Sequence, residues 1–355
     1  MIGRLKGNAL QNGDQIRSSP EIKGREAPAF ENQNAKPGSP APDFAVQASY
    51  VRTVFLGPDG LRPGWGFAFY VAMFYPLQFV AQRWAGSFDL GASGLWSMML
   101  AEAAMLVAAV LPAIALMGVE RRSWGTYGLP GRFAFGRLFW VGVAWGFASV
   151  TLLLSLMYGL RIFDFGHLVL HGARIWRFAT FWAVFFLLVG FFEEFLLRGY
   201  TQFTLTRAIG FWPTAILLSC MFGLIHLQNA GEQWPGLLAA AAIGFFFCLT
   251  LRRTGNLWFA VGFHMAWDWG ETFLYSVPDS GTIFPGHLLK SSFHGPRWLT
   301  GGIVGPEGSV LCFVVIGITW VAFMNAYPEV KYFAGTRGSK PLNARASHPG
   351  HFYES

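Results

Sequence analysis

The chain has 355 residues, of which 53% are hydrophobic and only 13% are charged, whereas an average soluble domain is roughly 25% charged. Its formal net charge is +7, but the basic residues separate apolar segments and do not cluster. This arrangement excludes an ordinary soluble domain and argues against a nucleic-acid-binding protein. The cysteines Cys220, Cys248 and Cys312 lie in apolar stretches without CxxC spacing, so we predict packing residues and no disulfide framework.

The chain begins with a polar region, residues 1–60, that is rich in Gly, Pro, Asn and charged residues. We predict that this region is cytoplasmic and disordered, because it lacks the apolar residues needed to form a core. The sequence near Met1 has no apolar stretch typical of a cleavable signal peptide. A second polar region, residues 327–355, is predicted to form a cytoplasmic tail.

Residues 61–326 are predicted to form an all-α, polytopic membrane bundle of about eight helices. A membrane-spanning helix needs roughly 20 mostly apolar residues. Eight segments fit this requirement, at about 64–82, 93–118, 136–160, 178–203, 211–230, 235–251, 256–276 and 309–326.

The distribution of basic residues predicts the orientation of this bundle. Most of the 26 Lys and Arg residues fall in the two polar end regions and around the connections that follow the second, fourth and sixth spans. By the positive-inside rule, both termini are expected in the cytoplasm. The protein is thus predicted to be a multi-pass integral membrane protein, of the plasma membrane if the host is bacterial.

Few ionisable residues interrupt the predicted spans. A charge at the membrane centre costs roughly 2.5–3.5 kcal/mol on insertion scales, so such side chains are expected to face the bundle interior and are functional candidates. The candidates are Glu193, Glu194 and Arg198 in the fourth span, His226 in the fifth, and His264 and Asp268 in the seventh. We expect Glu271 to be solvated near the outer interface, and Glu102 to be an ordinary bundle contact.

Helical spacing separates the two adjacent glutamates. Glu194 lies four residues before Arg198, which is the favourable direction for an ion pair on one helix face. Glu193 is rotated by about 100° from that face and is left free to accept a proton. A purely structural Glu194–Arg198 bridge remains an alternative. His264 and Asp268 are also four residues apart and share one face of the seventh span.

These residues resemble the three motifs of the CPBP family of intramembrane glutamate-dependent proteases, which includes CAAX prenyl endopeptidases and Abi-type proteins. The resemblance covers residues of about 120–276. Glu-Glu-x-x-x-Arg matches Glu193, Glu194 and Arg198; Phe-x-x-x-His matches Phe222 and His226; His-x-x-x-Asn/Asp matches His264 and Asp268.

The resemblance implies an endopeptidase that cleaves a membrane-associated or lipid-modified protein or peptide within a lipid membrane. It implies that Glu193 and His226 activate a water molecule, while His264 and Asp268 support the oxyanion. Asn is commoner than Asp at position 268, and an ionised Asp268 would repel an oxyanion. Asp268 would therefore be protonated, orient His264 or bind a metal.

No cofactor is expected from these motifs. The alternative is a zinc ion held by Glu193, His226, His264 and Asp268, since two histidines and two carboxylates suit that metal.

Two other functions stay open. One is a non-catalytic relative that acts as an immunity or assembly factor, and the other is a proton-coupled transporter with a Glu and His relay. Transporters often contain inverted repeats, and no internal repeat is recognisable in this sequence.

Overall fold

The computed structural model describes residues 50, 52–58, 60–88, 94–229 and 231–332. Most of the predicted N-terminal polar region and most of the predicted tail therefore lie outside the described residues. Their assignment remains a prediction from the sequence.

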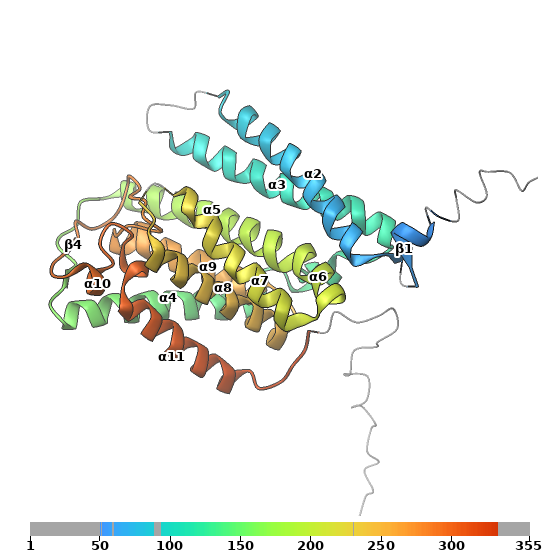
Figure 1. Ribbon diagram of the computed structural model, residues 1–355. Helices are drawn as coiled ribbons and strands as arrows, with labels where there is room; N and C mark the ends of the chain where they lie inside the picture. The colour runs from blue at the N-terminus through green and yellow to red at the C-terminus, as the bar shows by residue number, and fades with distance from the viewer. Residues whose placement is uncertain (1–49, 51, 59, 89–93, 230, 333–355) are drawn as a thin grey trace, which may run out of the picture. The chain divides into compact units, whose positions relative to one another are not determined.

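The described chain is built almost wholly from helices (Figure 1). They are α2 (Pro63–Ala85), α3 (Leu95–Glu120), α4 (Arg137–Gly159), α5 (Ala173–Glu194), α6 (Gln202–Ile209), α7 (Phe211–Ile225), α8 (Trp234–Thr254), α9 (Trp258–Trp269), α10 (Arg297–Thr300) and α11 (Val310–Ala326). Two π-helical segments, η3 (Phe195–Thr201) and η5 (Gly270–Tyr275), continue α5 and α9. Short 3-10 turns are η1 (Trp124–Tyr127), η2 (Gly131–Phe133), η4 (His226–Gln228) and η6 (Pro306–Gly308).

In the residues that the structure describes, the strands form two small antiparallel pairs. β1 (Leu56–Gly57) pairs with β2 (Gly60–Leu61), and β3 (Phe163–Asp164) pairs with β4 (Ser292–Phe293). The predicted all-α fold class is therefore confirmed.

Each predicted span corresponds to a helix whose ends differ from the prediction by a few residues. Five helices are long and apolar enough to cross a membrane, namely Leu95–Glu120, Arg137–Gly159, Ala173–Ile209, Phe211–Gln228 and Trp234–Thr254, and α11 is a shorter apolar helix. The chain is thus an integral membrane protein with a helical bundle. The count of eight crossings remains a prediction where it depends on α2, α9 and α11.

The connections between the helices gather at two ends of the bundle. At one end, β3 follows α4 and pairs with β4, which precedes α11. The backbone of Gly231, between α7 and α8, packs against that of Gly281, which follows α9. The connections 160–172, 226–233 and 276–309 therefore share this end.

The connections 121–136 and 255–257 and the segment after α11 meet at the other end of the bundle. Leu257 N, between α8 and α9, donates a hydrogen bond to Gly128 O at 2.7 Å, and Lys331 N, after α11, donates to Arg252 O at 2.9 Å. Successive connections thus lie at alternating ends of the bundle, as expected for helices that cross a membrane one after another. Which of the two ends faces the cytoplasm remains a prediction.

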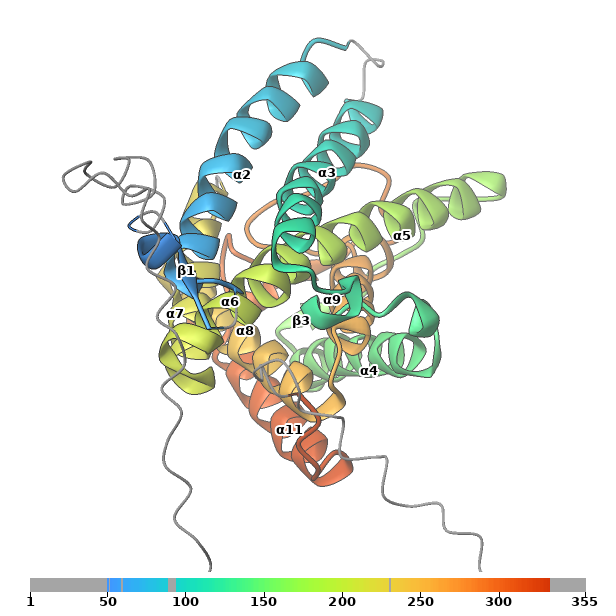
Figure 2. The same ribbon diagram turned by 90° about the vertical axis from the view of Figure 1, so that its right-hand side faces the viewer.

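Helix α9 lies between α4 and α5 in the middle of the bundle (Figure 2). Gly142 and Gly146 of α4 face its backbone, where a methyl group would collide with the carbonyl oxygens of Phe259 and Phe263. Gly262 of α9 packs as closely against α4. Small residues allow membrane helices to approach at backbone distance, so these glycines fix the position of α9 and of the side chains on its opposite face.

The helix that carries the first motif changes its winding directly after Glu194. Residues Phe195–Thr201 are π-helical, and Gly199 has the non-helical angles φ −82° and ψ −113°. A Cβ atom at Gly199 would lie 2.7 Å from the Phe195 ring, so the kink requires glycine. π-Helical turns within α-helices are frequent at functional sites.

The three cysteines have no disulfide partner. Cys248 and Cys312 are buried as expected, but Cys220 is exposed on α7. The expectation that Cys220 packs in the core was wrong, because the outer face of a membrane helix is as apolar as its inner face.

Candidate active site

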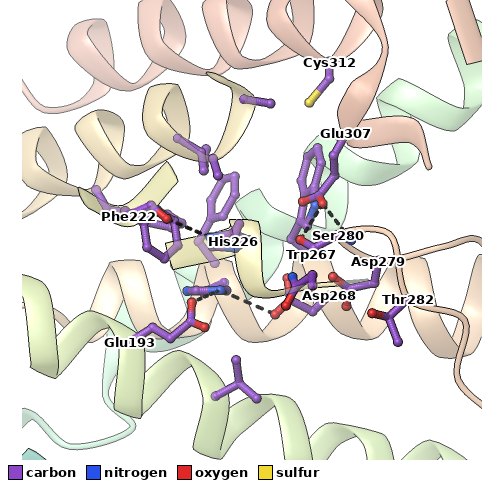
Figure 3. Close-up of a pocket in the computed structure, with 18 of the residues that line it drawn as sticks. Glu193, Phe222, His226, Trp267, Asp268, Asp279, Ser280, Thr282, Glu307 and Cys312 are labelled. Carbon is purple, nitrogen blue, oxygen red and sulfur yellow. Dashed lines mark hydrogen bonds and ion pairs between the residues drawn. The ribbon is translucent and has the colours of Figure 1, made fainter. Parts of the chain in front are cut away.

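A cavity of about 230 Å³ lies inside the bundle, bordered by α3, α5, α7, α8, α9 and α11 and by the connection between α9 and α11 (Figure 3). Four residues predicted from the sequence line it, namely Glu193, His226, His264 and Asp268. They come from three elements, α5, η4 and α9, and are up to 75 residues apart in the chain. The fold therefore brings the three motifs to one place.

Glu194 and Arg198 form an ion pair below this cavity. Arg198 Nη1 lies 3.2 Å from Glu194 Oε1, and both side chains are fully buried. The guanidinium group also lies 4.4 Å from the centre of the Phe222 ring, in a cation–π contact. Gly244 of α8 makes room for both, since a Cβ atom there would collide with Arg198 and Phe222. The first two motifs are thus joined through Arg198 and Phe222.

His264 lies at the centre of three carboxylates. Its Nδ1 atom is 3.1 Å from Glu194 Oε1. Its Nε2 atom is 3.5 Å from Glu193 Oε2 and 3.5 Å from Asp268 Oδ2. A protonated His264 therefore donates on both sides of the ring. Glu194 is held by His264 as well as by Arg198, a contact that spacing along one helix does not predict.

His226 occupies the end of α7, where the helix tightens into η4. Its Nδ1 atom is 2.8 Å from the carbonyl oxygen of Phe222, and the Phe222 ring packs edge-on against the imidazole at 4.8 Å. When Nδ1–H donates to that carbonyl, Nε2 keeps a lone pair for the cavity. The Phe222 and His226 spacing of the second motif thus fixes the orientation of the ring.

Glu271 does not have the solvated position expected from the sequence. Its side chain is fully buried. The reason is that the chain becomes π-helical at Gly270 and the connection 276–309 then folds back over it. This connection brings Asp279 and Glu307 close, so that one carboxylate oxygen of each residue lies within 4.8 Å of the other two.

Three further acidic residues line the cavity wall, Glu102, Asp279 and Glu307. From the sequence, Glu102 was expected to be an ordinary bundle contact, and Asp279 and Glu307 were not singled out. Glu102 Oε1 is buried and has no hydrogen-bond partner among the residues that the structure describes. The sequence does contain a signal for Glu102, because a single carboxylate within an apolar membrane span is energetically costly. Asp279 and Glu307 lie in a connection between helices, where acidic residues are common and do not by themselves indicate a functional site. Burial raises the pKa of the Asp279 carboxyl well above its ordinary value, and the charges of Asp268 and Glu307 raise it further.

Comparison with known families locates this site within one recognisable segment. Residues 175–270 match the family described as type II CAAX prenyl endopeptidase Rce1-like. This segment belongs to the CAAX protease family. It contains all three motifs and runs from α5 to the first residue of η5. No curated protein and no solved structure matches the chain.

The family assignment agrees with the membrane setting. CAAX proteases of this type are hydrolases that act in a lipid environment on protein or peptide substrates. Glu102, Asp279 and Glu307 lie outside the CAAX protease segment, although they border the same cavity.

Proposed function

We propose that the protein is an intramembrane endopeptidase. It hydrolyses a peptide bond of a membrane-associated or lipid-modified protein or peptide, using a water molecule activated by glutamate and histidine. The observation that carries this proposal is the convergence of Glu193, His226 and His264 on one cavity within a segment of the CAAX protease family.

Glu193 is the general base in this proposal. Its side chain is 25% exposed, whereas that of Glu194 is fully buried and already paired. A base must reach water and must exchange its proton during the reaction, which suits Glu193 and not Glu194. His226 Nε2, whose orientation is fixed through Phe222, is the second acceptor that positions the water.

His264 supports the oxyanion. Glu193 takes a proton from water, the oxygen attacks the peptide carbonyl carbon, and the C=O electron pair moves onto the carbonyl oxygen. A protonated His264 balances the carboxylates around it and donates to this oxygen, and such aimed donors give large rate effects in water-poor sites. Asp268, 3.5 Å from His264 Nε2, positions the ring. Collapse then breaks the C–N bond, and the leaving amine takes the proton from Glu193.

The cavity limits the part of the substrate that it holds. Its apolar wall includes Phe185, Phe247 and Ile316, which suit an apolar peptide segment. Its volume of about 230 Å³ is below the roughly 300–1,000 Å³ of typical small-molecule pockets. The cavity therefore holds the residues around the scissile bond, and a lipid chain on the substrate stays outside it in the bilayer.

The test is a comparison of peptide termini in membranes that contain the wild type, Glu193→Gln or Glu329→Gln. Glu329 is a matched control because its side chain is 76% exposed and lies at the other end of the bundle. We expect termini that appear with the wild type and with Glu329→Gln and disappear with Glu193→Gln at equal abundance. Identical termini in all three samples would instead favour a non-catalytic relative or a transporter.

A further inference from the structure

Three acidic side chains converge beside the catalytic cavity, at the junction of η5 with the connection between α9 and α11. Glu271 comes from η5, Asp279 from the start of this connection, and Glu307 from its end. One carboxylate oxygen of each lies within 4.8 Å of the other two. Both oxygens of Glu271 are buried, and neither accepts a hydrogen bond of normal geometry in the part of the chain that the structure describes, although the Trp267 side chain is a donor close to this carboxylate.

The two other acids are held in place by hydrogen bonds from the protein. Glu307 Oε2 accepts from Ser280 N at 2.9 Å and from Ser280 Oγ at 2.8 Å. Asp279 Oδ2 accepts from Thr272 Oγ1 at 3.1 Å. These donors orient both carboxylates and leave Glu307 Oε1 and Asp279 Oδ1 for another ligand.

No basic side chain pairs directly with these carboxylates in the described part of the chain, and the His264 imidazole acts on Asp279 only from beyond ion-pair distance. Among the described residues, no Lys, Arg or His lies within ion-pair distance of Glu271, Asp279 or Glu307. A buried carboxylate without an ion-pair partner, such as Glu271, is costly, and the neighbouring carboxylates of Asp279 and Glu307 add repulsion. An unpaired and fully buried Glu271 that faces two oriented carboxylates is the arrangement expected around a cation.

We propose that Glu271, Asp279 and Glu307 bind a calcium ion. The ligands are all oxygens, which suit Ca²⁺ or Mg²⁺ and not a softer metal. Oxygens on opposite sides of Ca²⁺ are about 4.6–5.2 Å apart, and those around Mg²⁺ about 4.0–4.2 Å, from the usual metal–oxygen distances. The ligand oxygens lie within 4.8 Å of one another, which Ca²⁺ accommodates, and three protein carboxylates suit Ca²⁺ better than Mg²⁺, which is usually bound by one or two. This site shares no residue with the zinc alternative at Glu193, His226, His264 and Asp268.

The ion would connect the catalytic helix to the loop that borders the cavity. Asp279, Ser280 and Glu307 all line the cavity, and Glu271 lies three residues after Asp268 in the chain. Calcium would therefore hold the connection 276–309 against η5 and fix this wall of the site.

The experiment measures calcium binding by the purified full-length protein in detergent. The protein is stripped with EGTA and dialysed against radioactive Ca²⁺, and its thermal unfolding is followed in EGTA, Ca²⁺ and Mg²⁺. The variants are Glu271→Gln and Asp279→Asn. Glu102→Gln is the matched control, since Glu102 is another poorly paired carboxylate of the cavity that lies outside the cluster.

We expect the wild type and Glu102→Gln to bind one Ca²⁺ per chain and to unfold at a higher temperature in Ca²⁺ than in EGTA. Each cluster variant should lose affinity by on the order of 10-fold or more, because the charge of the ligands sets calcium affinity. In EGTA, Glu271→Gln should unfold at a higher temperature than the wild type, because it relieves repulsion. This reversal of order between EGTA and Ca²⁺ distinguishes a lost ligand from a damaged fold.

A wild type that binds no Ca²⁺ and unfolds at the same temperature in EGTA and Ca²⁺ would overturn the proposal and leave protons as the neutralising species. Stabilisation by Mg²⁺ but not by Ca²⁺ would reject calcium as the ion. If both cluster variants fail to fold, the presence or absence of Ca²⁺ binding to the wild type still decides whether the site exists. These measurements do not use proteolysis, so the calcium site and the proposed activity can fail separately.

Discussion

Glu193 and Glu194 are adjacent and chemically identical, yet the structure gives them opposite sensitivities to the same substitution. Glu194 is fully buried, and its Oε1 atom contacts Arg198 at 3.2 Å and His264 at 3.1 Å. Glu193 is 25% exposed and has one longer contact, 3.5 Å to His264. Replacement of each by glutamine keeps the shape and removes only the charge. The pair of variants therefore separates an anchoring role from a catalytic one.

The expected losses of stability follow from these environments. Removal of one partner from a buried ion pair costs about 3–5 kcal/mol, because the other charge is left uncompensated. Glutamine keeps one acceptor oxygen for Arg198, so we expect a loss of about 3 kcal/mol for Glu194→Gln. The partly solvated contact of Glu193 is worth less than about 1 kcal/mol. At roughly 2–4 °C per kcal/mol, Glu194→Gln should lower Tm by on the order of 10 °C and Glu193→Gln by a few degrees at most.

Thermal unfolding in detergent and the analysis of peptide termini provide the two readouts. Glu193→Gln should be stable and inactive, whereas Glu194→Gln should lose both stability and activity. The double variant Glu194→Gln/Arg198→Met should recover part of the lost stability, because no unpaired arginine remains. Equal Tm values for the two single variants, or full activity of Glu193→Gln, would refute the assigned roles.

Three further predictions concern the oxyanion site, the orientation and the helix packing. Asp268→Asn should keep activity, because an amide retains the shape and still orients the ring; stoichiometric zinc in the wild type, lost with activity in this variant, would show a metalloprotease instead. Reporter fusions after Arg83 should read as exoplasmic and those after Arg253 as cytoplasmic; an inverted pattern would contradict the orientation. Gly146→Leu should lower membrane abundance strongly, because the new side chain collides with the backbone of α9, and abundance equal to the wild type would contradict the close crossing.

Much of the fold was predictable because a bilayer imposes a simple length requirement. Apolar runs marked the helices to within a few residues, and the cost of intramembrane charge singled out Glu193, Glu194, His226, His264 and Asp268. Four of these five line one cavity, and the fifth supports it from below. A charged side chain that is energetically unfavourable in a membrane span thus predicts a functional site even before its partners are known.

The remaining features depend on geometry that local patterns do not contain. The π-helical turn at Gly270 ends the regular helical period before Glu271, so helical spacing does not give the position of this side chain. Asp279 and Glu307 are ordinary acidic residues in a connection, and only its fold over η5 makes them part of the cavity wall. The approach of His264 to both adjacent glutamates likewise needed the packing of α9 against α5.

The orientation of the bundle determines which side of the membrane supplies calcium to the proposed site, and it bears on the side from which the substrate enters. The connections that contain His226, Asp279 and Glu307 share one end of the bundle, and the positive-inside rule predicts that this end lies outside the cytoplasm. There, an affinity of about 10⁻⁴–10⁻³ M, typical of extracellular calcium modules, is enough for occupancy. On the cytoplasmic side the same site would need about 10⁻⁷–10⁻⁵ M, as in calcium sensors. Because Asn229, Ser280 and Thr282 from this end also border the cavity, a measurement of the calcium affinity, together with the reporter fusions, would test from which side of the membrane the scissile segment enters.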